Sequence, residues 1–209
     1  MKNLLILLSL ILFIDTCYAD EKLPAPSQKR GTDIMTALQA RRSIRTYSER
    51  ILSKQDLSDV LWAAQGVNRP EEGKLTSPTA RNRQEIIIYV FTKKGISKYD
   101  KTNHSLIDIR KGDYREAVAG NQKRFATAPL FLVMIASTTQ FGNKSAHALE
   151  MMAADAGIVS ENINLFAAAT GLCTVTRGIM DKKKVLSILN LDDSFNCILN
   201  NPIGYPAQE

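Results

Sequence analysis

The sequence has few of the residues that build metal centres and covalent catalytic sites. Its 209 residues include two histidines and three cysteines, and neither His104 nor His147 has a Cys or His partner three or four positions away. It also lacks a nucleophile elbow, an HExxH pair, a Walker loop and a dinucleotide fingerprint. The sequence therefore predicts no metal site and no catalytic residue of its own, so that any chemistry would come from a bound cofactor.

Long basic runs are also missing. The formal net charge of +6 permits an anionic ligand, but the lysines are scattered and no groove-reading motif accompanies them, so we expect no nucleic-acid partner. With 44% hydrophobic and 23% charged residues the composition is that of an ordinary globular protein, and the length suits one domain with its own core.

One long apolar run is present, at the N-terminus. Lys2 precedes an apolar stretch over residues 4–14, and Cys17-Tyr18-Ala19 follows with a small-x-small pattern. This arrangement is typical of a secretory signal peptide, so we expect residues 1–19 to be cleaved and the protein to be exported, to the periplasm. The run is short for a bilayer, so no stable membrane span is expected. A lipoprotein attached through Cys17 and an uncleaved anchor are the alternatives.

Removal of residues 1–19 would leave a lead-in and a single domain. Residues 20–31 contain two prolines and a glycine and predict a flexible lead-in, and residues 32–209 form the domain. The two cysteines that remain are Cys173 and Cys197. They could form a disulfide in an exported chain, or they could be buried free thiols; the sequence leaves both open.

The periodicity of apolar residues predicts a mixed α+β fold. Helices are expected after Thr32 or Asp33, after Ser53, over 146–170 and after Asp181, with helical character at 113–125. Strands are expected at 86–91, 96–99, 130–136 and 172–176, with an extended end over 194–209 and a polar loop over 67–84. Because strands and helices do not alternate regularly, we expect an α+β architecture rather than a doubly wound sheet.

The segment 146–170 is almost apolar on every side, and Gly171 ends it as a C-cap. A helix of this composition has to be buried on more than one face. Since a chain of this size has little left to cover the second face, we expect a homodimer.

The segment Arg41-Arg42-Ser43-Ile44-Arg45-Thr46-Tyr47 stands out because three arginines and a serine fall within five residues. In an extended chain Arg41, Ser43 and Arg45 point to one side. Guanidinium groups bind phosphate through charge-assisted, often bidentate hydrogen bonds. A solvated basic loop is an equally good interpretation of this segment taken alone.

Five segments, taken in order, resemble the nitroreductase family of FMN-dependent oxidoreductases. Residues 41–47 resemble its N-terminal signature, and residues 78–84 are similar to its Pro-Ser-x-x-Asn-x-Gln loop. Gly95 to Tyr99, with His104 and Leu106, resembles the hairpin of the shorter members. The fourth match resembles the long helix and the turn after it, and consists of Ala156-Gly157, Glu161-Asn162 and Gly171-Leu172. The fifth match, Pro202 to Pro206, resembles the closing segment.

The resemblance implies an α+β homodimer with a central, mostly antiparallel sheet flanked by helices, and with FMN at the subunit interface. It implies that the basic segment holds the phosphate, ribityl chain and pyrimidine edge through Arg41, Arg42, Ser43 and Arg45. It further implies that Asn82, with Thr79 nearby, bonds the edge of the flavin ring from the partner subunit. Three residues would lie against the ring and offer backbone N–H groups toward N5: Thr176, Arg177 and Gly178.

The implied activity is reduction of nitroaromatics, quinones or similar flat electrophiles by ping-pong hydride transfer through the flavin. The donor would be NAD(P)H or, for an exported protein, an unknown periplasmic donor. The alternative is a non-catalytic flavin- or ligand-binding relative on the same scaffold.

Three positions depart from the family pattern. Glu161 stands where Gln is common, and Cys173 occupies a usual glycine place. No Lys or Arg follows Lys184, so phosphate binding would rest on Arg41, Arg42 and Arg45.

Overall fold

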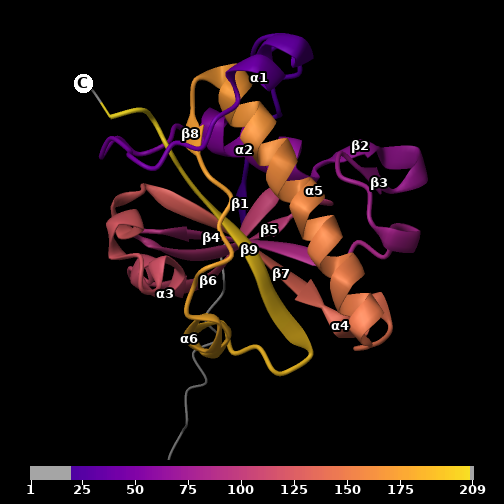
Figure 1. The fold of residues 1–209 in the computed structure, drawn as a ribbon. Coiled ribbons are helices and arrows are strands. Elements are labelled where there is room, and N and C mark those ends of the chain that lie inside the picture. Colours follow the sequence, from indigo (N-terminus) through magenta and orange to yellow (C-terminus); the bar gives the residue numbers. More distant parts are fainter. Residues whose placement is uncertain (1–19, 208–209) are drawn as a thin grey trace, which may run out of the picture.

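A seven-stranded antiparallel sheet forms the centre of the computed structural model, which describes residues 20–207 (Figure 1). The predicted signal peptide, residues 1–19, lies outside the described residues. The strand order is β1-β6-β5-β4-β7-β9-β8. The strands are β1 (Asp20–Lys22), β4 (Ile86–Thr92), β5 (Gly95–Asp100), β6 (Ser105–Lys111), β7 (Leu130–Ser137), β8 (Cys173–Thr174) and β9 (Phe195–Gly204). Helices accompany this sheet, so the prediction of an α+β fold is confirmed.

Several helices begin directly after an N-capping residue. They are α1 (Ile34–Ala40), α2 (Lys54–Gln65), α3 (Arg115–Ala119), α4 (Thr138–Phe141), α5 (Ala146–Thr170) and α6 (Lys182–Ile188). Asp33, Ser53 and Asp181 each accept backbone N–H groups in the first turn of α1, α2 and α6. Gly171 ends α5 in the left-handed conformation, with φ of 74°.

The two faces of the sheet carry separate apolar clusters. Alternate residues of β7 show this division, because Leu132 and Met134 join the cluster with α2 and α5, whereas Phe131 and Val133 join the one with α3 and α6. All eight residues of β7 are buried, as expected for a strand covered on both sides. Figure 1 shows α5 crossing the front of the sheet, with α3 and α6 away from it.

Two predicted elements are shorter in the structure. The helical stretch at 113–125 is α3 followed by a separate 3-10 helix, η3 (Lys123–Thr127), because Gly120 adopts φ of 61°, and a Cβ at this position would come within 3.2 Å of the backbone of Met180. The strand at 172–176 ends at Thr174. Its register with β9 places Val175 opposite Pro202, which has no N–H to donate.

The polar loop at 67–84 contains more structure than the sequence predicts. It includes the two-stranded pair β2 (Val67–Arg69) and β3 (Lys74–Leu75) and the 3-10 turns η1 (Pro70–Glu72) and η2 (Ala80–Asn82).

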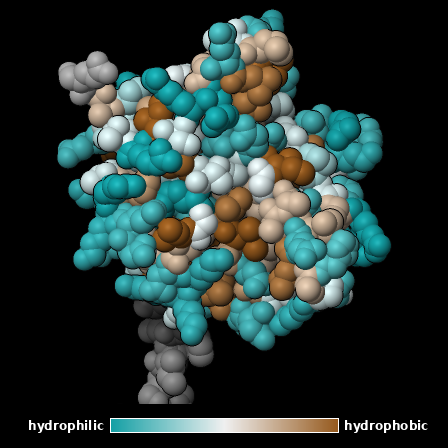
Figure 2. Space-filling view, in the orientation of Figure 1, coloured by the Kyte–Doolittle hydropathy of each residue, from teal (hydrophilic) through white to brown (hydrophobic). Residues whose placement is uncertain are grey.

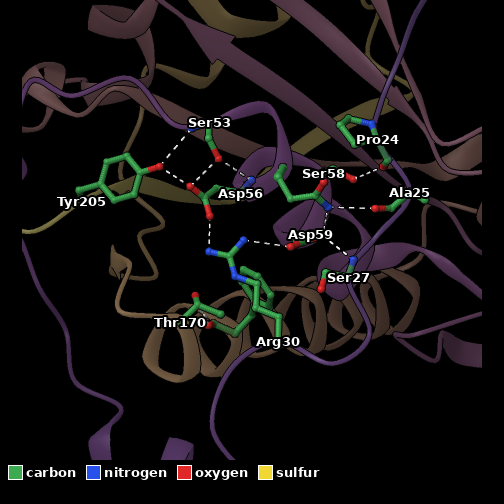
Figure 3. Close-up of polar contacts among 12 residues, drawn as sticks. Pro24, Ala25, Ser27, Arg30, Ser53, Asp56, Ser58, Asp59, Thr170 and Tyr205 are labelled. Carbon is green, nitrogen blue, oxygen red and sulfur yellow. Dashed lines mark hydrogen bonds and ion pairs between the residues drawn. The ribbon is translucent and has the colours of Figure 1, made fainter.

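Residues 20–32 form an N-terminal strap rather than the flexible lead-in that the sequence predicts. The first three residues are β1, which pairs with β6 at the edge of the sheet. The strap then runs along α2, where the N–H of Ser27 donates to Asp59 at 2.8 Å. Arg30 bonds both Asp56 and Asp59, the latter at 3.0 Å (Figure 3). These partners are distant in sequence, so local signals in the chain do not indicate the contacts of the strap.

The long helix α5 is buried on one side and open on the other. Ala156, Val159 and Ile163 are buried against the sheet, whereas Ile158 is 37% exposed on the outer side, where Glu150 and Glu161 are exposed as well. Figure 2 shows apolar side chains gathered on the face that α5 crosses. The outer side of α5 is therefore uncovered in the single chain.

Cys173 and Cys197 are buried free thiols, which decides between the two alternatives left open by the sequence. Across residues 20–207, no helix combines the length and apolar character needed to cross a membrane.

Candidate functional site

The arginine segment, residues 41–47, leaves α1 and lies beside β8. The N–H of Ile44 donates to the carbonyl of Thr174 at 3.0 Å, and the buried Tyr47 donates its hydroxyl to the carbonyl of Ile44 at 3.0 Å. Ile44 and Tyr47 thus anchor the segment to the fold. The four polar side chains that the sequence singles out remain exposed: Arg41, Arg42, Ser43 and Arg45.

The bond to Thr174 brings this segment next to the turn that follows β8. Thr176 is exposed, and its hydroxyl is held by Ser160 at 2.6 Å and by Asn164 at 2.9 Å. Gly178 is also exposed, and a Cβ built there would meet no atom within 4 Å. The basic segment is therefore bonded to the strand that leads into this exposed turn.

Thr79 and Asn82 lie in a second place, on the loop that precedes β4. The hydroxyl of Thr79 accepts the N–H of Gln84 at 2.8 Å, and the exposed Asn82 accepts from the Gln84 side chain at 3.2 Å. The N–H of Ala80 donates to Asp155 of α5 at 2.8 Å. We call residues 79–84 the β4 loop.

The two sets of residues attach to different parts of α5. The β4 loop is bonded at Asp155, whereas the entry to α1 is bonded at Ala169, where Thr32 donates its N–H at 3.1 Å. These helix positions are 14 residues apart, which is about 21 Å along the axis of an α-helix. Among the described residues, no hydrogen bond or ion pair joins the basic segment to the β4 loop.

The comparison with known proteins decides the family. The model of the Nitroreductase family matches residues 38–205, a range that includes both sets of residues. The chain belongs to the nitroreductase family. A protein of Methanocaldococcus jannaschii with the provisional name of nitroreductase is 30% identical over 166 residues, covering 73% of this chain and 82% of its own.

Solved structures of the nitroreductase family agree with this assignment. A provisionally named nitroreductase from Ralstonia eutropha superposes with a TM-score of 0.83 at 30% identity, covering 91% of this chain and 90% of its own. A protein from Clostridium acetobutylicum, provisionally named an NADH oxidase, has a TM-score of 0.58 at 23% identity, with 85% and 89% covered. The second likeness supports the fold alone.

Arg177 occupies a different place in this nitroreductase-family chain from the one expected. Its side chain is buried, and its guanidinium donates to Asn200 at 2.8 Å, to the carbonyl of Ala119 at 2.9 Å and to Gln122 at 3.1 Å. Its backbone N–H donates to the carbonyl of Asn200 at 2.9 Å. Arg177 therefore caps the C-terminus of α3, and its backbone N–H is already bonded within the chain.

A buried polar network behind Thr176 was not predicted. Asn201 is fully buried in β9, accepts from Ser160 at 2.7 Å and donates to Asn164 at 3.1 Å and to Thr174 at 3.2 Å. The signal in the sequence is Asn200-Asn201, since asparagine is uncommon in strands and two in a buried strand indicate a specific role.

The charges around the basic segment suit a phosphate. Within the described part of the chain, no carboxylate lies in ion-pair distance of Arg41, Arg42 or Arg45. Arg42 is close enough to Cys173 to affect it: burial raises the pKa of this thiol, and the guanidinium partly offsets the rise. Exposed cations without acidic partners are a donor set that fits the phosphate of FMN.

Proposed function

We propose that this nitroreductase-family protein is an FMN-dependent oxidoreductase that reduces flat electrophiles such as nitroaromatics and quinones. The observation that carries the proposal is the set of exposed arginines, without acidic partners, on a segment bonded to the strand that leads to the exposed Gly178. Membership of the family supports an oxidoreductase, and the donor set supports a phosphate-bearing cofactor.

Each part of the site has a role that follows from its chemistry. Arg41, Arg42 and Arg45 would bind the phosphate, with Ser43 on the ribityl chain. Bound FMN supplies the centre that accepts and returns a hydride. Gly178, with no side chain, leaves room for a flat ring.

Thr176 would orient the ring edge. Its hydroxyl is fixed by Ser160 and Asn164, and Asn201 fixes both of those residues from the buried side. The threonine is therefore pre-positioned, which lowers the entropy lost when a ligand binds.

We further propose that the site is completed in a homodimer. Asn82 and Thr79 would come from the partner, as membership of the family suggests, and within one chain no hydrogen bond among the described residues joins them to the basic segment. The uncovered outer side of α5, which includes the exposed Ile158, is the surface that a partner would bury.

Export and the electron donor are also proposals. The N-terminal pattern favours a periplasmic protein, with NAD(P)H or a periplasmic donor as the reductant. A variant lacking residues 1–19 should stay in the cytoplasm, and its appearance in the periplasm would contradict a signal peptide.

The test is an absorbance spectrum of the purified protein with FMN, followed by anaerobic titration with NADH and NADPH. We expect flavin absorbance that is bleached by a donor and restored by a quinone or a nitroaromatic. Protein that stays colourless after FMN addition would refute the proposal. Bound flavin that no donor can bleach would favour a non-catalytic binding protein instead.

The basic segment can be tested by substitution. The double variant Arg41→Ala, Arg45→Ala should bind FMN at least about 100-fold more weakly, because each charge-assisted bond contributes about 1.5 kcal/mol or more. Its melting temperature without flavin should equal that of the wild type, since both side chains are exposed. Unchanged affinity in a flavin fluorescence titration would remove the arginines from the site.

A further inference from the structure

A pair of buried carboxyl groups lies directly behind the β4 loop. Glu85 follows the loop at the start of β4, and its side chain is fully buried with neither oxygen hydrogen-bonded to a donor. The carboxyl of Glu85 is close enough to that of Asp155 on α5 for the two to interact, and Asp155, which is 5% exposed, accepts the N–H of Ala80 at 2.8 Å. Two carboxyl groups in contact in an apolar environment cannot both be ionised without strong repulsion.

One cation completes this buried group. Lys101, in the turn between β5 and β6, donates to the carbonyl of Gln84 at 3.2 Å and is close enough to Glu85 to interact with its charge. From α4 only the neutral Gln140 reaches this region, donating to the carbonyl of Gln84 at 3.0 Å. Among the described residues, the charged groups acting on Glu85 are thus Asp155 and Lys101.

We propose that Glu85 keeps a proton and donates it to the carboxylate of Asp155, and that this bond holds Asp155 against Ala80 and so positions the β4 loop for the flavin edge. Glu85 and Asp155 are then positioning residues for Asn82, not catalytic residues. The inference rests on the proposed function in so far as it concerns flavin.

The β4 loop needs such a support because its backbone is strained. Arg81, Asn82 and Gln84 have φ of 54°, 54° and 52°, in the left-handed region that residues other than glycine rarely adopt. Conformations of this kind persist only where the surrounding structure holds them. The bond from Ala80 to Asp155 anchors the start of the loop, and the bonds to the carbonyl of Gln84 anchor its end.

The proton is exchanged near neutral pH. Burial, and then the neighbouring Asp155, raises the pKa of Glu85 to about 7, while burial lowers the pKa of Lys101 to about 8. As the pH rises through this range, Glu85 loses its proton to solvent, and the resulting carboxylate repels that of Asp155. Asp155 is then drawn away from Ala80, and the loop loses its anchor.

The first experiment follows the Ala80 amide by NMR in the full protein without flavin, from pH 5.5 to 8.5. The wild-type signal should shift with a midpoint near 7. In Glu85→Gln the amide should not titrate, because glutamine donates to Asp155 without a proton to lose. An Ala80 amide that is constant in the wild type, or that titrates alike in Glu85→Gln, would overturn the inference.

A second variant protects the test against misfolding. In Asp155→Asn the side-chain oxygen can still accept the N–H of Ala80, while the repulsion is absent. The Ala80 signal should therefore keep its position across the pH range. The matched control is Asp59→Asn, another buried carboxyl, on α2. It should leave the titration of Ala80 as in the wild type, whatever it does to stability.

The second experiment measures the FMN dissociation constant at pH 6 and pH 8. The ratio of the wild-type constant to that of Glu85→Gln should rise about tenfold between the two pH values, which corresponds to loss of one charge-assisted bond. The ratio cancels titration of the phosphate itself. A ratio that does not change with pH contradicts the role of the pair, whereas a wild type that binds no FMN contradicts the proposed function and leaves the NMR result intact.

Discussion

The side chain of Arg177 has a structural role that its neighbours in the sequence do not indicate. Two buried groups, Asn200 and the carbonyl of Ala119, would lose their donor in Arg177→Leu. We expect a loss of about 3 kcal/mol in the free energy of unfolding, at about 1.5 kcal/mol for each bond to a charged group. In a protein of this size that lowers the melting temperature by about 6–12 °C.

Thermal unfolding of the flavin-free protein is the measurement, with Arg41→Ala as the control. Arg41 is exposed, so its removal should leave the melting temperature unchanged. Equal melting temperatures for the two variants would contradict a structural role for Arg177.

The carboxyl of Glu85 also makes global stability depend on pH. Because its pKa is raised in the folded state, the stability that it contributes is fully present below its unfolded pKa and is lost as the pH rises through about 7. Wild-type protein should therefore melt at a lower temperature at pH 8 than at pH 6, and Glu85→Gln should show a smaller difference. A larger difference between the melting temperatures at pH 6 and pH 8 in Glu85→Gln than in the wild type would contradict this role of Glu85.

At the scale of the elements, the N-terminal strap depends on Arg30. Burial alone would raise the pKa of Asp56, but hydrogen bonds from Tyr205, Ser53 and Arg30 outweigh it and hold that pKa below its usual value. The strap should thus be most secure above the unfolded pKa of Asp56 and loosen in acid. Figure 3 shows Arg30 between Asp56 and Asp59, so one side chain joins the strap to α2.

In Arg30→Ala the strap should open locally while the sheet stays folded. The N–H of Ser27, which is bonded to Asp59, should exchange with solvent at least about tenfold faster, since one to two kcal/mol of charge-assisted bonding is lost. Exchange at β7 should not change. Lys29→Ala, an exposed neighbour in the same strap, is the matched control. Unaltered exchange at Ser27 would mean that Arg30 does not hold the strap.

Elements defined by local signals could be predicted, and those defined by distant partners could not. Asp33 and Ser53 mark helix starts through their side-chain oxygens, Gly171 marks a helix end through its left-handed backbone, and these ends were predicted correctly. The three exposed, charged residues of β1 carry no strand signal, because their pairing with β6 arises only in the folded chain. The cap that Arg177 makes on α3 and the interaction between Glu85 and Asp155 also join residues distant in sequence, so the sequence did not predict them.

At the scale of the whole molecule, the outer side of α5 can be tested directly. Ile158→Asp places a charge on the side that a partner would bury, and an unpaired buried charge is strongly unfavourable. The variant should elute and scatter light as a monomer, and it should bind FMN poorly although its own arginines are intact. Asp108→Lys, an exposed change on β6, should leave the mass unchanged. A dimeric Ile158→Asp that binds FMN normally would place the partner surface elsewhere.

The separate positions of the basic segment and the β4 loop have a thermodynamic consequence for the proposed dimer. A ligand that must be held from both positions, one in each chain, binds the pair of subunits and not the separated chains. Its binding and the association of the subunits are then linked equilibria, and each strengthens the other by the same free energy. Flavin would accordingly act as a bridge between subunits, and dilution of the protein would release the cofactor.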